Sequence, residues 1–128
     1  ENVKLIEHKL TRILGNIIDN AIEALKESQT PYKEIKVQIQ RKNERIVFII
    51  WNNGPHIPKV VLNKIFNMGY STKVGGDRGL GLSIVKELLS EMDGSISVTS
   101  DAENGTSFII SVPFSLAEEE KIPTSLSM

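Results

Sequence analysis

The sequence predicts a two-layer α+β sandwich, in which helices pack on one face of an antiparallel sheet. Two pairs of short segments with alternating apolar residues, each pair joined by a polar turn, indicate two β-hairpins. Longer segments before and between these hairpins carry apolar residues at helical spacing. Because a hairpin pairs its strands antiparallel, the helices can bury their apolar stripes together against one face of the sheet.

The first half of the chain predicts a long helix and then a hairpin. Residues 3–27 form the helix, because one face is apolar at spacings of three and four: Leu10, Ile13, Leu14, Ile17, Ala21 and Ala24. Residues 28–33 contain a proline and predict a loop. Residues 35–39 alternate as a half-buried strand does. The polar turn 42–45 then leads into 46–51, whose continuous apolar run is typical of a strand covered on both faces.

The second half predicts two helices and a second hairpin. Residues 58–66 begin with proline and form a short helix. Residues 67–79 hold four glycines and almost no large apolar side chain, so we expect a mobile loop there. Residues 80–92 form an amphipathic helix, and Gly94 follows it as a C-cap glycine. The last hairpin comprises strands at 96–98 and 108–112 around a turn at 101–105.

Composition places the chain in the globular class and excludes several functions. The 128 residues are 40% hydrophobic and 24% charged, which suits a single folded domain. Fifteen Lys and Arg residues balance sixteen Asp and Glu residues, so there is no basic excess for nucleic acid. The absence of cysteine excludes a disulfide framework, a thiol nucleophile and a Cys-ligated zinc site.

The ends of the chain suggest one domain of a longer protein. The sequence does not start with Met, and its first residues do not resemble a signal peptide. The longest apolar run has six residues, whereas a membrane helix needs about 20, so we expect no membrane contact by this domain. We assign residues 1–114 to the domain and 115–128, which have no usable period, to a flexible tail.

Two asparagines on the first helix suggest a cation site. Asn16, Asn20 and Glu23 share one stripe, next to Asp19. A solvated polar face would explain the charged residues, but Asn is a poor helix former and adds no charge. Amide oxygens suit a hard cation such as Mg²⁺, which also binds phosphate and water. The spacing alone leaves both interpretations open.

A glycine-rich segment, 75–81, leads directly into the helix at 80–92. The backbone N–H groups at such a helix start can bind phosphate, although a flexible connector has the same composition. The segment is neither a P-loop, since no Gly-Lys-Ser/Thr occurs, nor a Rossmann fingerprint, since Ile84 replaces the third glycine. Residues Asn52–Pro55 follow a strand. They form either a plain turn or a set of polar side chains that contact the edge of a nucleobase. His8 is interpreted as a helix-surface residue.

Together these segments resemble the ATP-binding catalytic domain of sensor histidine kinases, within the gyrase, chaperone, kinase and mismatch-repair ATPase superfamily. The resemblance covers residues 3–114. The motifs follow the family order: the asparagine box Leu14–Ala21, the first glycine box Asn52–Pro58, the phenylalanine box and lid start Lys64–Lys73, and the glycine boxes Arg78–Val85 and Gly105–Phe108. The asparagine box is most similar to that of citrate and dicarboxylate sensor kinases. The resemblance implies a Bergerat fold: a mixed, mainly antiparallel sheet covered on one face by about three helices.

The resemblance also implies the cofactors ATP and Mg²⁺ and a role for each motif. Asn20 would ligate Mg²⁺, with Asn16 beside it, and Asn52 would take the place of the aspartate that reads the adenine amine. The other implied binding positions are Gly54 and Ile57 in the adenine pocket, Gly79, Leu80 and Gly81 at the phosphates, Lys73 and Arg78 as lid cations, and Thr106 on the adenine side.

Several positions depart from the family pattern. Asn52 stands where the family has Asp, and His56 replaces the second glycine of that box. Asn16 stands where the hydrolysing relatives carry the Glu that activates water. An amide is no general base, which favours phosphoryl transfer over hydrolysis. Glu23 stands where many members have a phosphate-contacting Lys.

We therefore expect a domain that binds Mg-ATP and donates the γ-phosphoryl group to a histidine on a partner phosphoacceptor domain of the same parent protein. A response regulator would receive the group next, as in two-component signalling. The resemblance places the domain in the cytoplasm, and the parent protein can still be anchored in a membrane. Two alternatives remain open: a degenerate nucleotide-binding regulatory module, and a serine protein kinase of the anti-sigma type.

Overall fold

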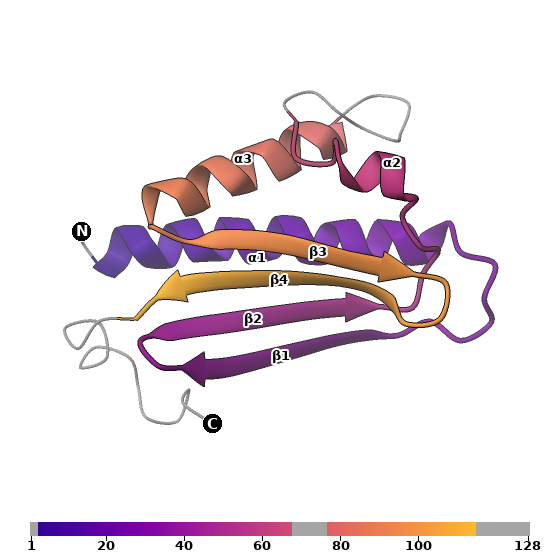
Figure 1. Cartoon of the computed structure of the whole chain (residues 1–128), viewed down its shortest axis with the longest axis horizontal. Coiled ribbons are helices and arrows are strands. Elements are labelled where there is room, and N and C mark those ends of the chain that lie inside the picture. Colours follow the sequence, from indigo (N-terminus) through magenta and orange to yellow (C-terminus); the bar gives the residue numbers. More distant parts are fainter. Residues whose placement is uncertain (1–2, 68–76, 115–128) are drawn as a thin grey trace.

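The computed structural model describes residues 3–67 and 77–114, and Figure 1 shows the arrangement of their helices and strands. The predicted tail, 115–128, lies outside the described residues. The elements in chain order are α1 (Val3–Lys26), β1 (Ile35–Lys42), β2 (Arg45–Asn52), α2 (Lys59–Leu62), α3 (Asp77–Glu91), β3 (Ser95–Asp101) and β4 (Gly105–Pro113).

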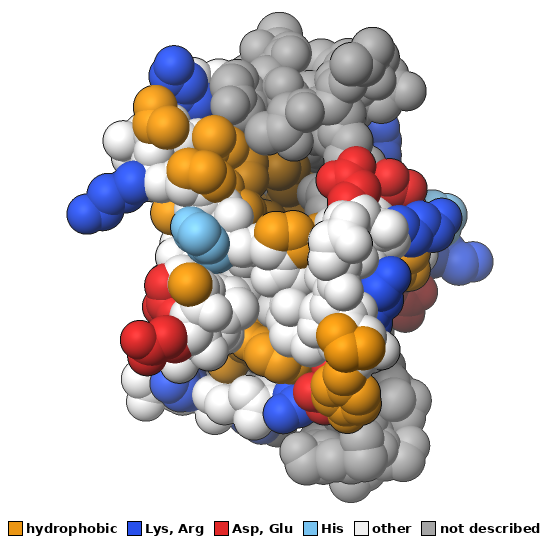
Figure 2. Space-filling model, turned by 90° about the vertical axis from the view of Figure 1, so that its right-hand side faces the viewer, with side chains coloured by type: hydrophobic (Ala, Val, Ile, Leu, Met, Phe, Trp, Pro, Cys, Tyr) orange, Lys and Arg blue, Asp and Glu red, His pale blue; other side chains and the backbone are white. Residues whose placement is uncertain are grey.

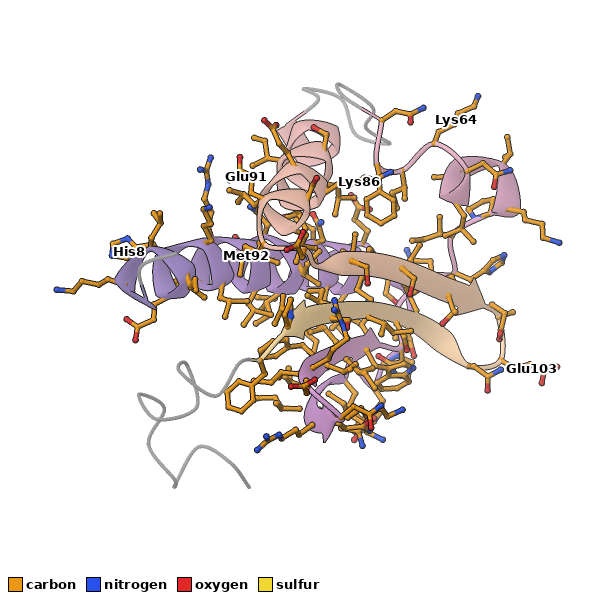
Figure 3. The ribbon with its side chains drawn as sticks, turned by 60° about the vertical axis from the view of Figure 1, so that its left-hand side comes forward. His8, Lys64, Lys86, Glu91, Met92 and Glu103 are labelled. Atoms are coloured by element: carbon orange, nitrogen blue, oxygen red, sulfur yellow. The ribbon has the colours of Figure 1, made fainter. Side chains whose placement is uncertain are left out.

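The four described strands form one sheet in the order β1-β2-β4-β3. Both predicted hairpins are present, and β2 joins them by pairing with β4. All three strand pairings in the described part are antiparallel, as the hairpin pattern predicts. The helices lie on one side of this sheet, which confirms the predicted two-layer α+β architecture (Figures 1 and 3).

The hydrophobic core lies between the sheet and the two long helices. α1 contributes side chains four residues apart, including the fully buried Ile13 and Ile17, and α3 contributes Val85 and Leu89. From the sheet, Ile110 and its inward-facing neighbours complete the cluster. The helical periodicity of the sequence therefore marks most of the buried stripe of α1, but it omits Leu25, which is also buried.

The central strand β2 differs from its prediction. Its side chains alternate, with Phe48 and Ile50 buried on the helix side. Val47, Ile49 and Trp51 are only half-buried on the opposite face. The prediction that both faces are covered is therefore wrong. Strands β1 and β4 flank these outer side chains on either side, and none of the described helices covers them. The outer face of β2 is therefore only partly buried.

The helix boundaries after β2 also differ from the sequence prediction. α2 ends at Leu62, so the predicted helix at 58–66 is a single turn followed by further turns. Two adjacent valines and then Asn63, all weak helix formers, account for its short length. α3 begins at Asp77, three residues earlier than predicted, because an acidic residue is favoured in a first helical turn. The rest of the predicted loop, except Asn67, lies outside the described residues.

The end of α3 is tied to the sheet. Asp93, and not the predicted Gly94, takes the left-handed conformation of the C-cap residue, with a φ of 56°. The N–H of Gly94 completes the cap by donating to the carbonyl of Leu89 at 2.7 Å. The Arg45 guanidinium at the start of β2 donates to the carbonyl of Asp93 at 3.0 Å. Among the described helices, none combines the length and the apolar character that crossing a bilayer requires.

Candidate functional site

The candidate site lies at one end of the molecule, where several predicted motifs meet (Figure 1). β2 and β3 end there, and β4 begins there. The C-terminal half of α1, the short α2 and the first turns of α3 lie at the same end. Figure 2 looks onto this end, whose centre is mainly uncharged surface with charged side chains toward the edges. An uncharged centre of this kind suits a neutral group such as a nucleobase.

Two buried polar residues form the base of the site. The register of β2 and β4 places Asn52 directly opposite Thr106, and each is only 3% exposed. The Thr106 hydroxyl lies 2.6 Å from the Ser100 hydroxyl, which also accepts the N–H of Ile57 at 2.8 Å. This network holds the segment after β2 against the ends of β3 and β4. Buried polar groups are retained when they are hydrogen-bonded, as the hydroxyls of Thr106 and Ser100 and Oδ1 of Asn52 are.

A tight turn after β2 fixes the Asn52 side chain. The N–H of Gly54 donates to Oδ1 of Asn52 at 2.8 Å. A Cβ at Gly54 would lie 2.9 Å from that oxygen and 3.4 Å from the Cβ of Ala24 on α1. Glycine is therefore required sterically here, because any side chain would collide with the Asn52 amide or push the turn away from α1.

At the start of β4, the backbone of Gly105 lies very close to the end of β2. Its φ is +75°, and a Cβ there would overlap the carbonyl oxygen of Asn52 and the indole of Trp51. The indole N–H of Trp51 donates to the carbonyl of Asn104 at 2.5 Å. The last glycine box thus has a structural reason, since only glycine lets β4 begin beside the end of β2.

The asparagine flank of α1 faces α3. Asn16, Asn20 and Glu23 are all half-buried. Lys9, which lies on the same flank by helical spacing, forms an ion pair with Glu91 of α3 at 3.1 Å. The polar stripe is therefore partly covered by the neighbouring helix and is not a fully solvated face. This geometry favours the site interpretation over the solvated-face interpretation.

The first turns of α3 lie roughly level with Asn20. The two helices run antiparallel (Figure 1). Asn20 is eleven residues, or about 16 Å, beyond Lys9, and Gly81 is ten residues, or about 15 Å, before Glu91. Since Lys9 and Glu91 are in contact, the two intervals bring Asn20 and the start of α3 to the same level. Unpaired backbone N–H groups at the start of a helix favour an anion there.

The donor atoms at this level fit a metal that brings its own anionic ligands. In residues 3–67 and 77–114, no group of three or more His, Cys, Asp or Glu side chains could enclose a metal ion. Asn16 and Asn20 supply neutral oxygen ligands on one half-buried flank. Mg²⁺ accepts few protein ligands and keeps phosphate and water oxygens, so this sparse donor set fits a nucleotide-bound Mg²⁺.

The predicted phosphate-binding residues lie mostly in the first turns of α3. Gly79 and Gly81 lie in the first turns of α3, as do Arg78 and Leu80, while Lys73 lies outside the described residues. The side chains of residues 77–81 also lie outside the description. Ile57 packs against the core, and its backbone is fixed through Ser100.

We assign two histidines and one asparagine no role in binding. His8 is exposed near the N-terminal end of α1, far from Glu103 in the β3–β4 turn (Figure 3), which confirms the prediction of a surface residue. His56 is exposed in the turn before α2. Asn53 has a structural role, because its amide bonds the N–H of Glu34 and the carbonyl of Tyr32.

Sequence reasoning missed Ser100 and Ala24. Ser100 follows the inward-facing positions of β3, Ile96 and Val98, and an inward-facing serine at a strand end was a usable signal. Ala24 was recognised only as a helix face residue. Its contact with Gly54 depends on how α1 packs on the sheet, and this contact is not encoded locally.

The Asp101 carboxyl in the β3–β4 turn has a lowered pKa. Hydrogen bonds from the side chain and the backbone N–H of Asn104 lower the pKa of the exposed Asp101 carboxyl below its ordinary value of 3.8. A bond from the backbone N–H of Glu103 and the nearby His56 act in the same direction. The carboxylate closes the β3–β4 turn, which is a structural role next to the site.

The comparisons with known proteins identify the family. A family model described as histidine kinase-, DNA gyrase B- and HSP90-like ATPase matches residues 6–116. The chain belongs to this ATPase family. Among its members, the chain is similar to sensor histidine kinases: it is 34% identical over 110 residues to the sensor protein CitS of Halalkalibacterium halodurans and 36% identical over 105 residues to the sensor histidine kinase DcuS of Escherichia coli strain K12.

These matches cover 86% and 82% of this ATPase-family chain but only 20% and 19% of the two relatives. The chain therefore spans about a fifth of the curated relatives it matches. Among solved structures, it resembles the nucleotide-free catalytic domain of histidine kinase ThkA, with a TM-score of 0.69 and 33% identity over 83% of this chain and 66% of that one. It also resembles full-length ShkA in complex with AMPPNP, with a TM-score of 0.71 and 27% identity over 84% of this chain and 22% of that one.

Proposed function

We propose that this domain binds Mg-ATP and donates the γ-phosphoryl group to a histidine on a separate phosphoacceptor domain. The observation that carries the proposal is the convergence of three features at one end of the fold. These are the buried Asn52–Thr106 pair, the amide flank of α1 and the start of α3. The similarity to ShkA, whose structure holds AMPPNP, supports a nucleotide site in this fold.

The base would lie against the end of the sheet. Asn52, Thr106 and Ser100 supply polar atoms there, and the half-buried Ile57 supplies apolar contact. Gly54 has no side chain that would collide with the Asn52 amide, and its N–H holds Oδ1 of Asn52 in place. A mostly uncharged pocket with a few fixed polar groups is typical of nucleobase recognition.

The phosphates would lie between α1 and the first turns of α3. Asn20 and Asn16 would ligate Mg²⁺, which neutralises charge on the phosphate oxygens when bound. The N–H groups around Gly79, Leu80 and Gly81 would bind phosphate oxygens, and Arg78 and Lys73 would add positive charge. Glu23 on the same flank is compatible with phosphate only when a metal lies between them.

The domain's share of the reaction is positioning. Asn16 and Asn20 cannot take a proton from water at neutral pH, so these two amides offer no general base for hydrolysis. Phosphoryl transfer needs an aligned donor, neutralised charge and an incoming nucleophile. The nucleophile would be the imidazole of the partner domain, which we expect to belong to the same parent protein. A response regulator would then receive the phosphoryl group, and the domain would work in the cytoplasm, where ATP is available.

A regulatory module without turnover is the second candidate. Asn52 and His56 favour it, because both depart from the family pattern at the base-binding motif. Titration with Mg-ATP separates the two candidates, since a degenerate module would not bind at millimolar nucleotide. A serine kinase of the anti-sigma type is separated by the product, because phosphohistidine is acid-labile and phosphoserine is acid-stable.

The test uses the 128-residue chain in calorimetric titrations with ATP, with and without Mg²⁺. We expect saturable binding that Mg²⁺ strengthens. A second step adds a separately purified acceptor domain and radiolabelled ATP, and we expect an acid-labile phosphoryl group on that domain. The absence of binding at millimolar Mg-ATP would refute the proposal.

A further inference from the structure

The orientation of the Asn52 amide is fixed by its own turn. Oδ1 of Asn52 accepts the N–H of Gly54 at 2.8 Å. Reversing the amide would place its NH2 group against the N–H of Gly54, so two donors would face each other and the bond would be lost. Ala24 of α1 lies beside this turn, 3.4 Å from the place a Cβ of Gly54 would take. The amide therefore has a defined polarity.

The other end of this amide is a donor without a protein partner. Within the described parts of the chain, Nδ2 of Asn52 makes no hydrogen bond, although the residue is only 3% exposed. Nδ2 is not sealed from solvent, since no buried side-chain nitrogen or oxygen of the described residues lacks a partner. The small accessible part of Asn52 thus presents N–H groups to whatever lies at the end of the sheet.

The neighbouring polar groups do not share this fixed polarity. The hydroxyls of Ser100 and Thr106 lie 2.6 Å apart, and either can donate to the other. Thr106 can therefore offer a ligand a proton or a lone pair by reversing that bond. Asn52 cannot adapt in this way, so it decides which edge of a base is favoured.

We propose that Asn52 relaxes base selection in this domain, so that 6-oxopurine nucleotides such as ITP and GTP bind as well as ATP or better. This inference rests on the proposed function, and it names the substrate class of the same site. Adenine carries a donor at position 6, its exocyclic amine, whereas hypoxanthine and guanine carry an acceptor, a carbonyl oxygen. The Nδ2 group complements the carbonyl oxygen and, where it faces position 6 of adenine, meets the amine donor to donor. Only an adenine displaced along its edge can pair ring N1 with Nδ2 and its amine with Oδ1. Oδ1 keeps a second lone pair, so adenine is disfavoured and not excluded.

The experiment compares nucleotides on the full 128-residue chain by calorimetry with Mg²⁺. The probes are ATP, ITP, GTP and purine riboside triphosphate, which lacks any group at position 6. We expect ITP to bind at least as tightly as ATP, and purine riboside triphosphate to bind more tightly than ATP because the clash is removed. Asn52→Asp removes the donor, so we expect at least a fivefold tightening of ATP and at least a fivefold weakening of ITP.

Asn53→Asp is the matched control. It adds the same charge one residue further along, but the Asn53 amide bonds backbone groups of Glu34 and Tyr32 and not the base edge. We expect the ratio of ITP to ATP affinity to stay within twofold of wild type. GTP tests the 2-amino group separately, because guanine and hypoxanthine share the carbonyl at position 6. Weak binding of GTP together with tight binding of ITP would indicate crowding at position 2 and would still support the inference.

The outcomes distinguish this inference from the function on which it rests. If no nucleotide binds at millimolar concentration, the proposed function fails and the inference fails with it. If wild type binds ATP more than tenfold tighter than ITP, or if Asn52→Asp leaves the ratio unchanged, the inference is overturned while nucleotide binding stands. A change of equal size in Asn53→Asp would also overturn it, because charge and not donor polarity would then explain the effect.

Discussion

At the scale of single residues, Asn20 carries the proposed metal contact. Asn20→Ala removes the amide oxygen from the half-buried flank of α1 that faces α3. We expect at least a tenfold loss of Mg-ATP affinity, which corresponds to about 1.4 kcal/mol, and a much smaller loss for ADP without metal. Calorimetry with and without Mg²⁺ measures both. Asn20→Asp is the control, because a carboxylate is also a hard oxygen ligand and restores part of the affinity.

Equal losses with and without Mg²⁺ would contradict the metal role of Asn20. They would instead indicate that the side chain supports the packing of α1 against its neighbours. A loss of thermal stability in Asn20→Ala, without any change in the dependence on Mg²⁺, would lead to the same conclusion.

Gly54 offers a steric test of the base site. In Gly54→Ala the new Cβ would lie 2.9 Å from Oδ1 of Asn52, so the amide or the turn must shift. We expect nucleotide affinity to fall at least fivefold while the fold is retained. Gly15→Ala is the matched control: Gly15 lies on the exposed side of α1 with nothing within 4 Å of its Cβ position. This change removes a helical glycine, so we expect about 0.5–1 kcal/mol of stabilisation and unchanged affinity. Unchanged nucleotide affinity in Gly54→Ala would refute the steric argument.

At the scale of elements, the β3–β4 hairpin depends on Gly105. Gly105→Ala combines a φ of +75° with overlap against Asn52 and Trp51. We expect a loss of about 2–4 kcal/mol in the free energy of unfolding, measured by urea denaturation. Asn43→Gly is the comparison, because Asn43 occupies the β1–β2 turn with a φ of 58°. Glycine relieves that strain, so we expect a change within about 1 kcal/mol. Similar losses in the two variants would contradict the assigned overlap.

The turn of the same hairpin carries the pH dependence. Hydrogen bonds from Asn104 lower the pKa of Asp101 in the folded state. The stabilisation is therefore fully present above the ordinary value of 3.8, and it is lost as the pH falls through the lower folded-state pKa. An NMR titration of the Asp101 carboxyl carbon checks this, and Asn104→Ala should move its midpoint back toward 3.8. A wild-type midpoint at or above 3.8 would contradict the assigned hydrogen bonds.

At the scale of the whole molecule, the domain is expected to transfer phosphoryl groups only to another domain. His8 is exposed near the N-terminal end of α1, far from the end of the sheet that carries Asn52 (Figure 3). Mixed with an acceptor domain and labelled ATP, the chain should label that domain and not itself. Mass spectrometry of the separated proteins measures both. Stoichiometric label on His8 would contradict the expectation, and His8→Gln should leave the transfer rate unchanged.

Local patterns in the sequence are enough to predict the kinds of elements and the residue types available to the site. The spacing of Ile13 and Ile17, like the alternation in β4, follows from the local geometry of helix and strand, so periodicity reveals it. The same local logic placed Asn16 and Asn20 one turn apart and Asn52 at a strand end. Element boundaries are harder to predict from the sequence, as the early start of α3 at Asp77 shows. Gly75 and Gly76 directly before it indicate a loop, and so hide the helix start.

Which of these residues meet depends instead on how the whole chain folds. Pairing of β2 with β4 placed Asn52 opposite Thr106, although the two are more than fifty positions apart in the sequence. The packing of α1 on the sheet brought Ala24 against Gly54, in the turn that holds the Asn52 amide. A local pattern cannot encode such contacts, because they depend on strand order and helix placement. These are set by burial summed over the whole core, and the base selection proposed for Asn52 depends on them.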